Sequence, residues 1–167
     1  LFKEFVLSAS FKQISSLLYG FSTEVTPTSA SKIENFQEHL SLGTSINVTF
    51  LPGSNLRDTV TVCKRLNEEG FNPVPHIVAR NFENRGALEI FLDLLVSTAN
   101  VCEVLVIAGG IARPLGPFSD SLQILNSGLL EKYQIRKVGV AGHPEGSPDI
   151  NKDKLANAIN DKNKWAS

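Results

Sequence analysis

The sequence contains no methionine, not even at position 1, and only two cysteines. Because an intact translation product begins with methionine, we expect a processed, trimmed or incompletely covered product. The cysteines, Cys63 and Cys102, are far apart and form no C-x-x-C pair. Their number and spacing argue against a disulfide framework and against a structural zinc site.

The sequence also lacks long apolar runs and an excess of either charge. No apolar run approaches the roughly 20 residues that a membrane span requires, so we expect no transmembrane segment. Sixteen Lys and Arg residues against 17 Asp and Glu residues give a net charge of −1, without a basic stripe. The charge pattern therefore does not indicate a nucleic-acid-binding surface. No secretory signal with a cleavage site is present, which favours a cytoplasmic or mitochondrial protein over a secreted one.

Residues 1–16 allow two interpretations. This segment combines apolar residues with lysines, namely Phe2, Phe5, Val6, Leu7, Lys3 and Lys12. Such a pattern is typical both of a packed N-terminal helix and of the stub of a transit segment. We favour the helix, which would close the bottom of a barrel or lie on a neighbouring subunit.

The sequence pattern of residues 17–167 is that of one α/β domain. The whole sequence is 42% hydrophobic and long enough for one sizeable core. From residue 17 onward, short apolar runs alternate with segments of helical period, which predicts a parallel sheet. The predicted strand centres lie about 30 residues apart, the length of a βαβ step. They are Ser22, Val48, His76, Ile107 and Val140.

Apolar stripes with a spacing of three or four residues predict five helices between and after these strands. The stripes are Ile33, Phe36 and Leu40; Leu56, Val60, Cys63 and Leu66; Leu88, Leu92 and Leu95; Leu122, Leu125 and Leu129; and Leu155, Ile159 and Trp165. Ser29 and Ser31 are available to cap the first helix, and Gly70 is placed to end the second.

The spacing alone leaves two architectures open. An open five-stranded sheet of flavodoxin type needs about this length. A complete (β/α)8 barrel usually takes about 250 residues, so this chain would supply only its first five units. Doubly wound sheets that bind phosphate carry a Gly-rich turn after the first strand, whereas this sequence has Glu24-Val-Thr-Pro27 there.

Polar groups follow the apolar runs at successive predicted strand ends. The clearest example is the run from Val138 to Asp149, an apolar strand that ends in Gly-His-Pro-Glu-Gly. Functional groups at successive strand ends are what a (β/α) barrel requires, because its active site is built there.

These strand ends resemble the methylenetetrahydrofolate reductase family, flavin enzymes on a (β/α)8 barrel. The resemblance runs from about Phe21 to Trp165 but reaches only five of the eight units. Gly-His-Pro-Glu-Gly is its most specific motif and resembles a divergent reductase-like branch. The resemblance implies a partial barrel of five sequential parallel units over residues 17–167. It also implies an FAD-dependent oxidoreductase that acts on a folate-linked one-carbon substrate.

The resemblance further implies roles for individual residues. Glu24, followed by Pro27, matches a catalytic Glu that serves as a general acid toward a substrate nitrogen. Thr49, after Val48, and His76, after Pro75, match flavin contacts. The other implied FAD contacts are Ile107, Ala108, Gly109 and Gly110 around the ring, Phe118 and Ser119 at the adenosine end, His143 at the fifth strand, and Lys162 toward the phosphates.

The sequence departs from the family at the fourth strand. The reductases carry Arg-Gly-Asp there, where this chain has Ala108-Gly109-Gly110. That Asp lies near the flavin and the pterin, so the resemblance implies flavin binding more strongly than folate reduction. His143 also replaces the family's usual Tyr, and units six to eight of the barrel are not represented.

Each candidate residue also has a purely structural interpretation. Glu24 can be a capping or loop carboxylate, His76 a core residue, and Lys162 part of a solvated helix face. Thr49 can be a hydroxyl on the sheet face, and Gly109-Gly110 a tight turn.

Three alternatives accompany the flavin-enzyme hypothesis. The first is a non-catalytic descendant of the reductases, a structural subunit of a larger assembly, with the mitochondrion as one candidate location. In that case another subunit or further chain covers the edge of the fifth strand. The second is a metal-dependent barrel hydrolase with Glu24, His76 and His143 as ligands, although no tight ligand spacing supports it. The third, a flavodoxin-like binding module, lacks a phosphate loop.

Overall fold

The computed structural model describes residues 13, 15–16, 19–51, 53–148 and 150–166. The predicted helix or leader stub at residues 1–16 lies almost entirely outside the described residues and stays a prediction. In the described part of the chain, no helix is long and apolar enough to cross a membrane. Both cysteines are free thiols, and Cys63 lies in the core, where burial raises the pKa of its thiol.

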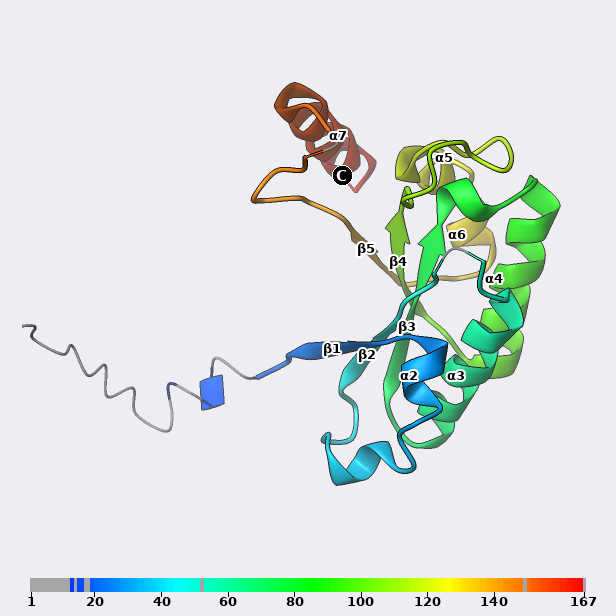
Figure 1. Cartoon of the computed structure of the whole chain (residues 1–167), viewed down its shortest axis with the longest axis vertical. Coiled ribbons are helices and arrows are strands. Elements are labelled where there is room, and N and C mark those ends of the chain that lie inside the picture. Colours follow the sequence, from blue (N-terminus) through cyan, green and yellow to red (C-terminus); the bar gives the residue numbers. More distant parts are fainter. Residues whose placement is uncertain (1–12, 14, 17–18, 52, 149, 167) are drawn as a thin grey trace, which may run out of the picture.

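Five short strands form one parallel sheet (Figure 1). The strands are β1 (Ser22–Val25), β2 (Ser45–Val48), β3 (Asn72–Val78), β4 (Glu103–Ile107) and β5 (Lys137–Val140). Their spatial order is β1-β2-β3-β4-β5, and every neighbouring pair is parallel. The predicted sequential order is therefore confirmed. A flavodoxin-type order of 2-1-3-4-5 is excluded.

The helices follow the strands, but two of the five predicted helices are broken. The α-helices are α2 (Pro27–Ala30), α3 (Leu56–Glu68), α4 (Arg85–Ala99), α5 (Ser121–Leu125), α6 (Leu129–Lys132) and α7 (Lys152–Trp165); the 3-10 helices are η1 (Phe36–Glu38) and η2 (Ala79–Asn81). Helices α3 and α4 match the second and third predictions. Gly70, with φ of 87°, follows the last turn of α3 as predicted.

The first predicted helix is wrong, because local polar contacts stop it after one turn. Thr26 and Ser29 form a reciprocal capping box that starts α2 at Pro27, while Ser31 lies at its C-cap rather than its N-cap. The guanidinium of Arg65 then takes the carbonyls of Ala30, Ile33 and Glu34, which a longer helix would have used internally. The fourth predicted helix is likewise divided into α5 and α6 at Gly128, whose φ is 71°.

The hydrophobic core lies on one face of the sheet. Alternate residues of β2 and β4, such as Val48 and Val104, are fully buried there against the helices. Figure 1 shows α3 and α4 along this side of the strands, with no described helix along the other side of β2 and β3. The residues between them in sequence, such as Asn47 and Leu105, are only half-buried. This second face is less covered than the first, although Val74 and Val78 of the central strand are buried on it. We call it the open face.

Candidate functional site

Glu24 and His76 meet at the carboxyl end of the sheet. Glu24 lies on β1 and His76 on β3, yet Glu24 Oε2 is 3.6 Å from His76 Nε2. This distance is short enough for an electrostatic pair but too long for a good hydrogen bond. The carboxylate is 59% exposed, whereas the imidazole is 7% exposed. An accessible acid thus stands beside a buried base.

Thr49 contributes a second buried polar group beside His76. Val48 pairs with Pro75 in the parallel ladder, so the next residues along, Thr49 and His76, are neighbours on the open face. The Thr49 amide donates to the carbonyl of Val25 at 2.8 Å, which fixes the strand end. The Thr49 hydroxyl and both ring nitrogens of His76 are buried without any hydrogen-bond partner.

Three unpartnered atoms in one place need an explanation. A buried polar group without a partner costs about 1–3 kcal/mol, and most such groups in proteins are satisfied by protein, water or ligand. Burial lowers the pKa of His76, and the nearby Glu24 carboxylate opposes this shift only in part. The imidazole is therefore neutral near pH 7, with one nitrogen that donates and one that accepts. This place is suited to a ligand with a polar edge.

The end of β4 forms the next part of the site. Ile107 pairs with Val78, and the Ala108 carbonyl accepts a hydrogen bond from the Arg80 amide at 3.0 Å. Gly109 has φ of 96°, and a side chain there would clash with Val78 Cγ1. Close packing therefore explains Gly109. Gly110 has open space where a side chain would point, so a ligand can approach its backbone.

Phe118 and Ser119 have different surroundings. Phe118 belongs to the hydrophobic core and is 7% exposed, so packing alone explains this residue. The Ser119 hydroxyl bonds with Asp120 and Gln123 at the start of α5. Ser119 is thus part of a cap, and its carbonyl accepts from Arg80 Nε at 2.7 Å.

Lys162 reaches the carboxyl end of the sheet, whereas His143 is not brought to Glu24 and His76. Lys162 Nζ donates to the Ala141 carbonyl at 2.7 Å, directly after β5. Burial lowers the pKa of Lys162, and the charge of Asp120 opposes this shift. Lys162 is therefore no simple solvated lysine. His143 is exposed, has φ of 48°, and accepts a turn hydrogen bond from the Gly146 amide.

Sequence reasoning missed Arg80 and Asn81. The Asn81 side-chain oxygen is a further buried atom without a partner, and it lies beside the space that a Cβ at Gly109 would fill. Arg80 binds the loop between β4 and α5. Their position was the one indication in the sequence, since both residues are polar, follow the end of β3 and lie within five positions of His76. The sequence did not show which loop they contact.

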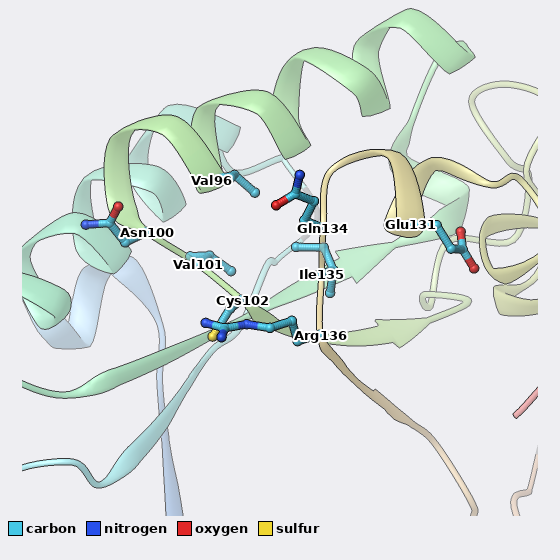
Figure 2. Close-up of a pocket in the computed structure, with 8 residues that line it drawn as sticks. All are labelled: Val96, Asn100, Val101, Cys102, Glu131, Gln134, Ile135 and Arg136. Carbon is cyan, nitrogen blue, oxygen red and sulfur yellow. The ribbon is translucent and has the colours of Figure 1, made fainter.

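A separate hollow lies at the opposite end of the sheet. Figure 2 shows this hollow between the end of α4 and the segment that leads into β5. Its volume is about 460 Å³, and Cys102 and Arg136 line it just before β4 and β5 begin. None of the predicted site residues contributes to it.

The described residues contain no group of three His, Cys, Asp or Glu side chains that could hold a metal ion. Glu24, His76 and His143 therefore do not assemble the ligand set that a metal-dependent hydrolase would need. No protein-family model matches this chain. The geometry that remains is a carboxylate beside a cluster of unpartnered buried polar atoms, at the carboxyl ends of parallel strands.

Proposed function

We propose that this chain binds a flavin, as FAD, at the carboxyl ends of its strands and serves an oxidoreductase similar to methylenetetrahydrofolate reductase. One observation carries the proposal. The Thr49 hydroxyl and both His76 nitrogens are buried without partners next to the exposed Glu24 carboxylate. A bound ligand with a polar edge would satisfy these atoms and offset their desolvation.

The residues present fit a flavin. The ring is planar, with polar edges and apolar faces, and the open face offers Leu105 and Ile107 beside Thr49 and His76. Thr49, His76 and the backbone from Ile107 to Gly110 would hold the ring. Ser119 would lie at the adenosine end, and Lys162 near the phosphates. FAD, when bound, supplies the redox chemistry, while the protein positions it and tunes its surroundings.

Glu24 would act as a general acid toward a nitrogen of a folate-type substrate. Its exposed carboxylate lies on the accessible side of His76, where a second ligand can reach it. Proton transfer from a positioned acid typically contributes about 10²–10⁴-fold to a rate. The end of β4 supplies no carboxylate, because Ala108, Gly109 and Gly110 stand there. Flavin binding is therefore better supported than folate reduction.

We also propose that the sheet is part of a (β/α)8 barrel. Five parallel strands in sequential order, with the core on one face, are what the first five units of such a barrel would form. Further residues of the same protein or another subunit would cover the free edge of β5. Val140 on that edge is 37% exposed, although it lies in the middle of an apolar segment.

A second function remains a candidate, that of a non-catalytic structural subunit in a larger assembly. Two observations favour it: no carboxylate stands at the end of β4, and β5 pairs only with β4 in the described sheet. In this case the unpartnered atoms on the open face would be satisfied by the partner that covers the sheet.

The absorbance spectrum of the purified protein distinguishes the two functions. We expect the bands of an oxidised flavin, or their appearance on titration with FAD, together with release of FAD on denaturation. The matched variants Thr49→Val and Thr61→Val test the site, because Thr61 has a partnered hydroxyl on the exposed side of α3. Only Thr49→Val should weaken FAD binding. A colourless protein that binds no added FAD but copurifies in a defined complex would favour the structural subunit.

A further inference from the structure

One residue of the preceding unit, Arg80, makes four hydrogen bonds with the loop between β4 and α5, residues 108–120. The Arg80 amide donates to the Ala108 carbonyl at 3.0 Å, and the Arg80 carbonyl accepts from the Leu115 amide at 2.9 Å. The Arg80 guanidinium donates to the carbonyls of Ser119, at 2.7 Å, and Ile111, at 3.2 Å. Arg80 therefore contacts the loop at its beginning, middle and end.

Two glycines allow the loop to lie this close. A side chain at Gly109 would clash with Val78, and one at Gly116 would clash with the backbone of Phe82 and Glu83. The loop itself contains no helix or strand that could hold its shape. Its conformation therefore depends on the core packing of Phe118 and on contacts with the segment from Val78 to Glu83, among which Arg80 makes the most hydrogen bonds.

The chemistry of these contacts requires arginine. A guanidinium carries five N–H donors in a planar fork, so one side chain can bond two carbonyls that lie apart. Lysine carries its donors on one atom and cannot reproduce the fork. Arg80 has no carboxylate partner in the described chain, so its side chain is committed to the loop and not to an ion pair.

We infer that Arg80 is the positioning residue of the ligand site: it fixes the loop whose two ends line that site. Ala108 lies at the proposed ring end, and Ser119 lies next to Asp120, whose charge acts on Lys162. Arg80 holds the Ala108 end with its backbone amide and the Ser119 end with its guanidinium, which sets the spacing between the two ends before a ligand arrives. Preorganisation of this kind raises affinity, because the loop does not have to be ordered on binding. The inference rests on the proposed function for the identity of the ligand.

The structure offers a matched control at Arg65. Its guanidinium also bonds backbone carbonyls, those of Ala30, Ile33 and Glu34, but it holds the segment between α2 and η1. Arg65→Lys and Arg80→Lys therefore remove guanidinium–carbonyl bonds from two different loops, although Arg65 also pairs with Glu69 at 2.6 Å. Only the Arg80 clamp is connected with the proposed site.

Hydrogen exchange and FAD titration test the inference together. For Arg80→Lys we expect amide exchange in residues 108–120 to rise about tenfold and the dissociation constant for FAD to rise about tenfold, since the loop must then be ordered by the ligand. For Arg65→Lys we expect faster exchange in residues 30–35 and unchanged FAD affinity. In Arg80→Ala, added ethylguanidinium should restore part of the FAD affinity and slow the exchange of the loop.

Three results would overturn the inference: unchanged exchange in residues 108–120 of Arg80→Lys, equal loss of FAD affinity in both lysine variants, or a loosened loop with unchanged affinity. If the wild-type protein binds no FAD, the proposed function fails by itself. Exchange in residues 108–120 and its rescue by ethylguanidinium then still decide whether Arg80 holds the loop.

Discussion

Thr49 and Thr59 both bury a hydroxyl group that has no hydrogen-bond partner, but only Thr49 lies at the proposed site. Thr59 is fully buried on α3 against the core, and nothing in the structure explains its unpartnered hydroxyl. A comparison of these two threonines separates the effect of an unsatisfied hydroxyl on stability from its effect on ligand binding. Both groups reduce stability, whereas only the one at the site can gain a partner when a ligand binds.

We expect Thr49→Val and Thr59→Val each to raise the free energy of unfolding by about 1 kcal/mol, because each removes a buried donor without a partner. Urea unfolding measures this gain. FAD titration of the same variants should show weaker binding for Thr49→Val only. A loss of stability in Thr49→Val would mean that its hydroxyl is already satisfied in the free protein.

His76 should make stability dependent on pH. Burial lowers its pKa below the ordinary value of about 6.5, so the unfolded chain binds a proton more readily than the folded protein. Stability is therefore full above about pH 6.5 and decreases as the pH falls toward the lowered pKa of the folded state. Urea unfolding between pH 7 and pH 5 measures how the free energy of unfolding decreases. We expect His76→Leu to abolish the part of this decrease that comes from the imidazole.

The variant Glu24→Gln tests the direction of this pH dependence. The Glu24 carboxylate raises the pKa of His76 against the effect of burial. Without that charge the folded-state pKa falls further, so the loss of stability should extend to lower pH and become larger. An unchanged pH profile in Glu24→Gln would show that the 3.6 Å pair has no influence on the imidazole.

At the scale of elements, α3 and α4 could be predicted because one continuous apolar stripe runs along each helix. The stripe of Ile33, Phe36 and Leu40 was misleading. Phe36 is buried as the stripe predicts, but Arg65 binds the carbonyls on which a continuous helix depends. That contact joins residues more than 30 positions apart, and periodicity within a short window cannot show it.

The same distinction applies to the candidate site. The meeting of Glu24, Thr49 and His76 could be predicted, because the carboxyl ends of parallel strands lie at one edge of the sheet. The roles of Arg80 and Asn81 could not. They depend on the path of an irregular loop some 30 residues downstream, and loop paths are set by tertiary contacts rather than by local pattern.

Helix α7 has few contacts that attach it to the rest of the described chain. It contains no buried residue, and its contact with the rest of the protein includes the bond from Trp165 Nε1 to the Leu125 carbonyl at 3.0 Å. We expect Trp165→Phe to remove this bond, to release α7 and to increase its amide exchange. Exchange in α3 and α4 should stay the same, because local opening does not require global unfolding.

If Trp165→Phe increased amide exchange throughout the sheet as much as in α7, this expectation would be wrong. Helix α7 would then be part of the cooperative core. The release of α7 has a second consequence. Lys162 would lose its bond to the Ala141 carbonyl, so FAD affinity should also fall in Trp165→Phe, if Lys162 contacts the phosphates as proposed.

Among the described residues, the sheet has one face covered by helices and one open face. The helices bury the side of the sheet that contains Val48 and Val104, while the site residues lie on the other side. The free edge of β5 adds unpaired backbone groups and the exposed Val140. Such an edge invites pairing with another strand, and natural proteins usually cover or charge it.

The open face and the β5 edge predict that these 167 residues alone are marginally stable and self-associate. At about 25 cal/mol per Å² of apolar surface, even a few hundred Å² left uncovered forfeits several kcal/mol. That amount is comparable with the whole stability of a typical domain, about 5–15 kcal/mol. Size-exclusion chromatography at several protein concentrations measures the association. Val140→Lys should reduce it, because a charge on an edge strand opposes pairing, whereas Ile90→Lys, at an exposed position of α4, should not. A stable monomer with cooperative unfolding would instead show that the sheet needs no further cover, and the proposal of a partial barrel would then fail.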